Sequence, residues 1–295
     1  RTRERSNAVG DVTIEVRRLS EPFQVGTTLK RTIATFFANF VPFNLLGLLV
    51  GVPGLLLIAV MVITLELGIF SLLQVEGAAA AEVPDFDFIH VLGTFGIAAL
   101  GLSIPYLIVA MIVHGTLQHL RGDRPRVFGS LKAGLRRAVP VIFVSFIVGV
   151  LFFVGWMFVV VPGVIVALMF CVAVPVVMAE QGGVLQSLSR SRALTRGQRW
   201  RILGLFLLAL VLTMLGMMLL MVPIQMMILM LPEGPAFSPE MTLLNLGITI
   251  VVFLLPLAMQ LFMTVFFAVL LGVLYHDLRV AKEGVSTDQI VTVFD

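Results

Sequence analysis

Residues 138–179 read AVPVIFVSFIVGVLFFVGWMFVVVPGVIVALMFCVAVPVVMA, a run of 42 residues without Lys, Arg, Asp or Glu. A helix that rises about 1.5 Å per residue needs about 20 apolar residues to cross a hydrocarbon core about 30 Å thick. The run is therefore long enough for two crossings. Because Pro and Gly together interrupt helices, Val161-Pro162-Gly163 is the predicted turn between the two crossings.

Four further stretches also lack all four charged residue types: 32–65, 88–120, 202–232 and 241–276. Each is long enough for one crossing, including a tilted one. Together the stretches predict six transmembrane helices, near residues 38–64, 89–117, 139–160, 163–179, 203–231 and 243–273. These helices form a predicted membrane domain over residues 31–276. A cytoplasmic N-terminal segment (1–30) and a cytoplasmic C-terminal tail (277–295) flank the domain.

The overall composition agrees with this assignment. Of the 295 residues, 59% are hydrophobic and 13% are charged. An ordinary soluble domain has roughly 45–50% apolar and about 25% charged residues, so this chain is too apolar to cover itself with a water-soluble surface. The composition predicts an all-α integral membrane protein. It also excludes nucleic acid as an expected partner, although the net charge is +3.

The basic residues predict the orientation in the membrane. All 20 Lys and Arg residues lie in the segments 1–31, 121–137, 190–201 and 279–282. Six crossings place these four segments on one side. The opposite side then receives only acidic charges: Glu66, Glu76, Glu82, Asp85, Asp87, Glu233 and Glu240. Because Lys and Arg favour the cytoplasmic side, both termini are predicted to be cytoplasmic.

Prolines accompany every predicted crossing. The candidate hinges among them are Pro53, Pro105, Pro175, Pro223 and Pro256. Pro removes a backbone donor and clashes with the preceding turn, so we expect kinked helices. Such helices form substrate sites in transporters, but Pro is also common in membrane helices generally, and this second explanation is favoured. Gly47 and Gly51 form a G-x-x-x-G pair that favours close helix packing.

Ionisable groups within the apolar stretches are few. His114 has Gln118 one turn further on, but no carboxylate or second metal ligand on the same face. A proton relay or metal site needs such a partner, so a hydrogen-bonded His inside the bundle is the favoured interpretation. Glu66 either lies near the membrane surface or marks a helix end.

The fifth predicted helix is rich in methionine. Its members are Met214, Met217, Met218, Met221, Met226, Met227 and Met230. Thioethers bind Cu(I), but no Cys or His accompanies them and they spread around the helix. Flexible packing is the favoured role. No metal and no other cofactor is expected.

Residues 184–195 (VLQSLSRSRALT) predict a short amphipathic helix at the cytoplasmic interface, with Gly197 as its C-terminal cap. Basic residues in and after it are candidate lipid- or phosphate-binding residues: Arg190, Arg192, Arg196, Arg199 and Arg201. Positive-inside anchoring explains the same residues without any ligand and is the favoured alternative. The loop from Arg121 to Arg137 has the same two explanations. Residues 23–33 predict an amphipathic lead-in to the first crossing, and Ser286 with Gln289 predicts a capping box.

Three groups of residues together resemble a known family. They are the Ser189–Arg201 run SRSRALTRGQRWR, the Val161-Pro162-Gly163 turn followed by Pro175 and Glu180, and the tail motifs Tyr275–Arg279 (YHDLR) and Lys282-Glu283-Gly284. Over residues 23–295 the chain resembles the bacterial glycerophosphoryl diester phosphodiesterase membrane-domain family, akin to YciC-like inner-membrane proteins. The resemblance implies a location in the bacterial cytoplasmic (inner) membrane.

The same resemblance does not imply an enzyme. In that family the membrane module is sometimes joined to a soluble phosphodiesterase barrel that performs the chemistry, and no such barrel lies in these residues. The chain also lacks H-E-x-x-H, G-x-S-x-G and a Gly-rich phosphate loop. No catalytic residue is therefore predicted.

Three functions fit these features. The leading hypothesis is a non-catalytic bundle that organises lipid, anionic at the cytoplasmic face, or a partner membrane complex. The second is a transporter or permease for a hydrophobic or amphipathic solute, which would need polar groups or broken helices at the membrane midplane. The third is an accessory subunit of a larger membrane complex.

Overall fold

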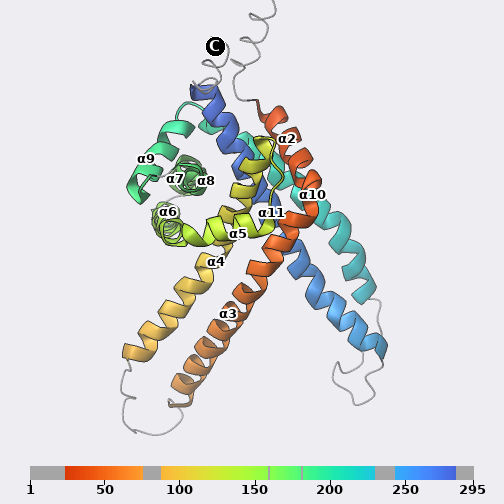
Figure 1. Cartoon of the computed structure of the whole chain (residues 1–295). Helices are drawn as coiled ribbons and strands as arrows, with labels where there is room; N and C mark the ends of the chain where they lie inside the picture. Colours follow the sequence, from red (N-terminus) through yellow and green to blue (C-terminus); the bar gives the residue numbers. More distant parts are fainter. Residues whose placement is uncertain (1–23, 76–87, 159, 181, 230–242, 284–295) are drawn as a thin grey trace, which may run out of the picture.

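The computed structural model describes residues 24–75, 88–158, 160–180, 182–229 and 243–283, and within these ranges the chain is helical with no strand. The helices are α2 (Val25–Ala38), α3 (Phe40–Val75), α4 (Phe88–Leu120), α5 (Val127–Arg136), α6 (Ala138–Phe158), α7 (Val160–Phe170), α8 (Ala173–Ala179), α9 (Val184–Thr195), α10 (Arg199–Leu229) and α11 (Leu243–Glu283) (Figure 1). The predicted all-α class is confirmed for this part of the chain. The predicted capping box at Ser286 lies outside it.

Several helices are suited to a membrane. By length and composition, four segments of the described chain could each cross one: Ala138–Met157, Val161–Ala179, Arg199–Met226 and Leu254–Glu283. The bent pair formed by α2 and residues 40–54 of α3 passes the same test, and counting it as one span raises the number to five. The apolar segment Ile104–Leu120 of α4 is shorter. The described part of the chain therefore has four or five candidate membrane-spanning helices, and the six predicted crossings stay a prediction.

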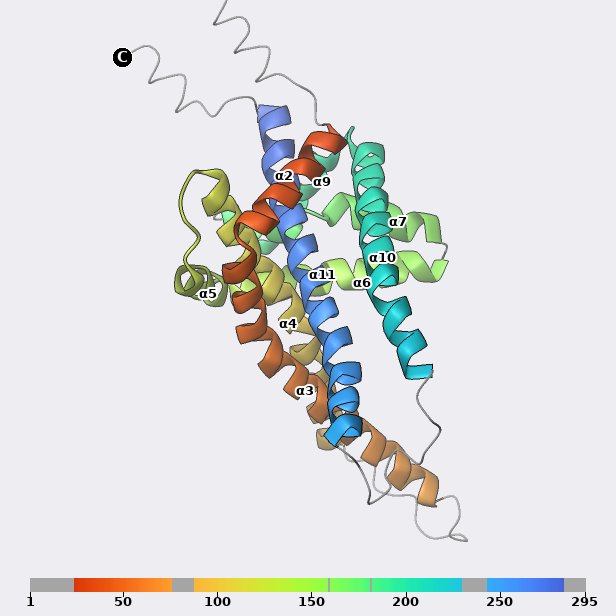
Figure 2. The same cartoon turned by 90° about the vertical axis from the view of Figure 1, so that its right-hand side faces the viewer.

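The long helices form two groups that spread apart in Figure 1, α3 with α4 and α10 with α11, and the α6–α7 hairpin follows neither direction. α3 packs along α4, and α4 packs along α11. α6 and α7 pack against each other and are seen end-on in Figure 1 but lengthwise in Figure 2, so they run across the direction of α10 and α11. The turn predicted at Val161-Pro162-Gly163 is wrong, because these residues form the first turn of α7, where a proline needs no N–H partner. Glycine permits the close approach of the two helices: a Cβ on Gly155 of α6 would lie only 3.0 Å from Gly163 Cα of α7.

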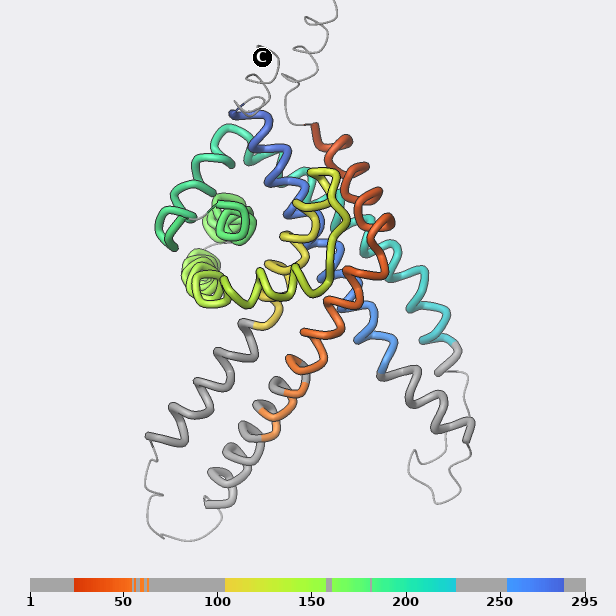
Figure 3. Tube along the Cα trace, viewed as in Figure 1, coloured from red at the N-terminus to blue at the C-terminus, as the bar shows by residue number. Residues whose placement is uncertain are grey.

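α2 and α3 meet at Asn39, where the helix axis bends by 77° (Figure 3). Pro42 in the first turn of α3 explains the bend, because it has no N–H for the Ala38 carbonyl group and its ring would clash with that carbonyl in a continuous helix. Asn39 instead closes α2: its backbone N–H and its Nδ2 donate to the Thr35 carbonyl oxygen at 3.2 and 3.0 Å.

The candidate hinge prolines occupy two kinds of position. Four lie inside helices that continue through them: Pro53 in α3, Pro105 in α4, Pro223 in α10 and Pro256 in α11. Pro175 lies in the first turn of α8, where a missing N–H costs no hydrogen bond. The helix expected over 163–179 is interrupted just before it, at Cys171 and Val172, because Pro175 cannot donate to the Cys171 carbonyl group.

The predicted glycine pair lies where α3 contacts two other helices. A Cβ on Gly47 would lie 2.8 Å from Leu261 Cδ1 of α11. A Cβ on Gly51 would lie 3.7 Å from Ile108 Cδ1 of α4 and 3.8 Å from the same Leu261 atom, which is ordinary contact. Gly47 therefore permits a close approach of helices, whereas the site of Gly51 has room for a methyl group.

A well-packed core of the described chain lies where α2, α4, α8, α9 and α11 meet, toward the end that holds the start of α2 and the end of α11 (Figures 1 and 2). Phe36, Met111, Leu194, Leu270 and Tyr275 are all buried there. α11 continues to Glu283, well past its expected end at residue 273, because Val273, Leu274 and Leu278 are buried in this core. Because α2, α9 and α11 pack on this core, their polar side chains are brought close to one another.

Candidate functional site

The C-terminal end of α11 carries a buried carboxylate, Asp277, with 9% of its side chain exposed. Asp277 Oδ2 accepts a hydrogen bond from the Thr28 hydroxyl at 2.6 Å, and Oδ1 accepts one from the Arg31 guanidinium at 2.8 Å. His276 Nδ1 lies 3.5 Å from the same Oδ1. Because Thr28 and Arg31 are three positions apart on α2, they share one face of that helix. Asp277 therefore fastens α2 to the end of α11.

A second polar cluster joins α11 to α9 and to the residue after α8. Glu180 Oε1 accepts hydrogen bonds from the Tyr275 hydroxyl at 3.0 Å and from Arg190 Nε at 3.1 Å. Another nitrogen of Arg190 forms an ion pair with Glu283, which also accepts a hydrogen bond from Arg279 Nε at 2.9 Å. Arg190 is thus shared by two carboxylates. We call these five residues the Arg190 cluster.

Backbone carbonyl groups tie α9 to its neighbours as well. Ser191 Oγ donates to the Met169 carbonyl oxygen at 2.9 Å, and Thr195 Oγ1 lies 3.3 Å from the same oxygen. Lys282 Nζ donates to the carbonyl oxygen of Ala193 in the last turn of α9. A cation at this position also interacts favourably with the C-terminal end of the helix dipole. Serine and threonine on one face of α9 are therefore used for packing.

Gly197 has φ of +85°, the left-handed conformation that commonly ends helices. This confirms its predicted role after α9, which ends at Thr195. The chain then turns directly into α10, which begins at Arg199.

The structure separates the five predicted lipid- or phosphate-binding arginines into different environments. Arg190 is committed to carboxylates. Arg192 and Arg196 are exposed, whereas Arg199 is half-buried. Arg201 is exposed, and its Nη1 lies 3.4 Å from Gln198 Oε1. Fewer arginines are therefore exposed here than the five that the sequence motif contains.

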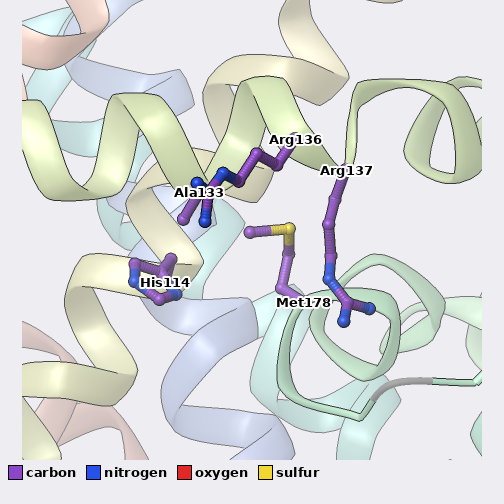
Figure 4. Close-up of a pocket in the computed structure, with 5 residues that line it drawn as sticks. All are labelled: His114, Ala133, Arg136, Arg137 and Met178. Atoms are coloured by element: carbon purple, nitrogen blue, oxygen red, sulfur yellow. The ribbon is translucent and has the colours of Figure 1, made fainter.

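A pocket of about 480 Å³ lies between α4, α5 and α8, lined by His114, Ala133, Arg136, Arg137 and Met178 (Figure 4). Figure 4 shows the Arg136 side chain running toward Ala133, with Met178 between His114 and Arg137. The two arginines are the last residue of α5 and the residue after it.

The two pocket arginines have different partners. Arg137 Nη1 donates to the carbonyl oxygens of Val177 at 2.7 Å and Glu180 at 3.0 Å, which lie at the end of α8. The last carbonyl groups of a helix lack partners within it, so Arg137 caps α8. Arg136 is exposed and has no hydrogen-bond or ion-pair partner among the described residues.

His114 is half-buried and hydrogen-bonded within α4, as predicted: Gln118 Nε2 lies 3.2 Å from His114 Nε2. Its position on the pocket wall was not predicted. Within the described ranges, no group of three or more His, Cys, Asp and Glu side chains could hold a metal ion. In the methionine-rich α10, Met214 and Met218 are 59% and 61% exposed, so these two thioethers face outward.

Sequence patterns missed several residues of this region. Thr28 and Arg31 lie in a segment treated only as an amphipathic lead-in, and their pairing with Asp277 has no local signal. Ala133, Arg136 and Arg137 belong to a loop that was predicted to be basic but not to line a pocket. A signal was present for Tyr275 and Asp277, since both belong to a motif of the family resemblance, but it did not indicate what they contact.

Comparisons with known proteins add no assignment: no family model, no curated protein and no solved structure matches the chain.

Proposed function

We propose that this chain is a non-catalytic, multi-pass membrane protein that organises anionic lipid or a partner membrane complex through a basic cytoplasmic face. The observation that carries the proposal is the surface at the α9–α10 junction. Arg192 and Arg196 are exposed there, in the same segment as Trp200, which is 84% exposed, and Leu185, which is 77% exposed. Guanidinium groups together with an exposed indole are typical of protein surfaces in the lipid headgroup region.

The described carboxylates near the end of α11 are all paired, which supports a structural role for this end of the molecule. Catalysis needs an acid, base or nucleophile that can reach a substrate. Asp277, Glu180 and Glu283 each accept from at least two donors on other residues. Groups held in this way serve to fix α2, α9 and α11 against one another.

The proposed topology has six crossings with both termini cytoplasmic, in a bacterial inner membrane. The clustering of the start of α2, the start of α10 and the end of α11 at one end of the molecule supports a single basic side (Figures 1 and 2). A hairpin returns the chain to the side on which it started. The sidedness of every basic segment is therefore the same whether α6 and α7 cross the bilayer or lie along its surface.

Cysteine labelling in intact cells tests this topology. The chain has one cysteine, so Cys171→Ala gives a background without thiols. In that background, a membrane-impermeant maleimide should label Ser238→Cys from outside and Asp123→Cys only after permeabilisation. Val161→Cys, in the first turn of α7, should be labelled from outside if α6 and α7 cross. Labelling of Asp123→Cys from outside would overturn the orientation.

We also propose membership of the glycerophosphoryl diester phosphodiesterase membrane-domain family. The positions of the motif residues support it. Glu180, Arg190 and Tyr275 come from three separate segments of the resemblance, and Arg190 and Tyr275 both donate to Glu180 Oε1. A role in packing α8, α9 and α11 against one another would explain these motifs, and it requires no catalytic function.

Purification in a mild detergent tests the proposed function. The wild-type protein should retain phosphatidylglycerol over phosphatidylethanolamine, or a defined protein partner, measured by mass spectrometry. The double variant Arg192→Gln/Arg196→Gln should retain less, because each exposed arginine near an anionic surface contributes about 1 kcal/mol. Arg192→Lys/Arg196→Lys keeps both positive charges at the same positions and is the matched control. A wild-type protein that retains neither enriched lipid nor a partner contradicts the proposal.

The identity of what is retained separates two forms of this proposal. A stoichiometric protein would make the chain an accessory subunit of a larger membrane complex. Lipid alone would make it a lipid-organising protein.

A transporter or permease for a hydrophobic or amphipathic solute is the second candidate. It is favoured by the four prolines inside continuous helices, since interrupted backbone bonding is a feature of transporter substrate sites. The test is movement of a fluorescent short-chain phospholipid between the leaflets of proteoliposomes, compared with Pro105→Ala and Pro256→Ala. Movement no faster than in protein-free liposomes counts against this candidate for that solute class.

A further inference from the structure

We infer that the pocket between α4, α5 and α8 is a binding site for a phosphate group, as a lipid headgroup or a small phosphate ester. The inference rests on the proposed function and gives the basic face one defined ligand position. The five residues that line the pocket include two arginines and a histidine but no carboxylate. The surroundings of the pocket therefore favour an anion.

The two arginines have complementary roles. Arg137 is held in place by the carbonyl oxygens of Val177 and Glu180, so it contributes a fixed positive charge to the pocket wall. Arg136 has no partner in the described part of the chain, and its guanidinium retains all five N–H donors. A guanidinium binds phosphate oxygens through two parallel, charge-assisted hydrogen bonds. Arg136 is thus the residue positioned to bind the anion directly.

The apolar lining suggests what accompanies the phosphate. Met178 is 8% exposed and forms a wall opposite His114, and Ala133 contributes a small side chain (Figure 4). A flexible thioether adapts to ligands of varied shape. On the same helix as Ala133, Phe128 is 80% exposed and Leu135 is 58% exposed. Exposed apolar side chains beside basic ones on α5 are typical of a helix that lies at a membrane surface, which makes a glycerophospholipid a suitable ligand.

Binding measurements on the full chain in a neutral maltoside detergent test the inference. The probes are dioleoylphosphatidylglycerol, dioleoylglycerol, sn-glycerol 3-phosphate and inorganic phosphate. We expect the wild type to bind a phosphate-bearing probe and not dioleoylglycerol, which has the same acyl chains without phosphate. Arg136→Gln should weaken that binding about tenfold, the effect of losing roughly one charge-assisted interaction.

Two further variants make the test specific to the pocket. Lys132→Gln removes an exposed charge from the same helix without touching the pocket and should change the affinity less than twofold. Ala133→Phe places an aromatic ring in the pocket and should weaken binding as much as Arg136→Gln does. Size-exclusion elution and the thermal unfolding midpoint in detergent show that each variant is folded, and Arg136→Lys should keep part of the affinity because it keeps the charge.

The outcomes separate this inference from the function on which it rests. Equal losses in Arg136→Gln and Lys132→Gln would mean diffuse attraction to the basic face and would overturn the pocket site alone. Failure of the wild type to bind any phosphate-bearing probe would also overturn it. Selective binding of phosphatidylglycerol assigns the pocket to a lipid headgroup, whereas selective binding of glycerol phosphate or inorganic phosphate assigns it to a soluble anion.

Discussion

The hydroxyl of Tyr275 donates a hydrogen bond to Glu180 Oε1 over 3.0 Å, between residues 95 positions apart. Tyr275 is buried on α11, and Glu180 follows α8. Arg190 donates to the same carboxylate oxygen, so the contact lies at the centre of the Arg190 cluster. This contact ties the last long helix to the segment that follows the α6–α7 hairpin.

Tyr275→Phe should lower the free energy of unfolding by about 1 kcal/mol, because it removes one hydrogen bond to a carboxylate that keeps its contact with Arg190. The thermal unfolding midpoint in detergent measures the loss. The only other tyrosine, Tyr106, is 40% exposed, and Tyr106→Phe is the matched control. Equal midpoints for the two variants would show that the Tyr275 hydroxyl contributes nothing.

Substitutions at Asp277, Thr28 and Arg31 should destabilise the protein by different amounts, set by how many contacts each one removes and by how exposed the side chain is. Asp277→Ala leaves the Thr28 hydroxyl and the Arg31 charge without their acceptor and should cost about 2–3 kcal/mol. Arg31→Gln should cost under about 1 kcal/mol, because its side chain is 59% exposed and solvent screens the pair. Thr28→Val should lie between them. Unfolding by sodium dodecyl sulfate titration gives the three values, and a larger loss for Arg31→Gln than for Asp277→Ala contradicts the ranking.

The first turn of α7 should tolerate no side chain at Gly163. A Cβ there would lie 3.0 Å from the Trp156 backbone nitrogen, and backbone atoms cannot move aside as a side chain can. Gly163→Ala should therefore destabilise the protein by about 1–3 kcal/mol. Gly149→Ala, also in the hairpin, meets open space and should be neutral or stabilising. Detergent unfolding midpoints compare the two variants, and similar midpoints would indicate that α6 and α7 are not in close contact there.

Neighbouring glycines of α3 should respond differently to alanine. A Cβ on Gly54 would lie 2.6 Å from Cγ2 of Ile104, a β-branched side chain with little freedom to rotate, whereas the nearest atom to a Cβ on Gly51 would be 3.7 Å away. Gly54→Ala should destabilise by about 1–2 kcal/mol, and Gly51→Ala should be tolerated. The retained fraction of folded protein after heating in detergent measures both. Loss of fold in Gly51→Ala would show tighter α3–α4 packing than these distances imply.

The sequence predicts features that depend on neighbouring residues better than features that depend on contacts between distant residues. The α9 helix over residues 184–195 and the left-handed Gly197 follow from neighbouring residues, so they were predicted with their positions. The continuation of α11 beyond the crossing predicted to end near residue 273 depends on distant residues, because Leu274 and Leu278 are buried against other helices. The sequence predicts the five arginines only as a group of lipid- or phosphate-binding candidates, because which of them pairs with Glu180 depends on packing.

The sequence alone determined that this is an α-helical protein with helices apolar enough for a bilayer, because a hydrocarbon environment demands uncharged runs that are visible residue by residue. It also determined the grouping of basic residues, on which the proposed orientation rests. Tertiary structure decided what those residues do. Thr28 meets Asp277 across 249 positions, and Arg136 and His114 meet at one pocket from different helices. Such contacts depend on how helices pack, and local patterns of charge and hydrophobicity do not specify that packing.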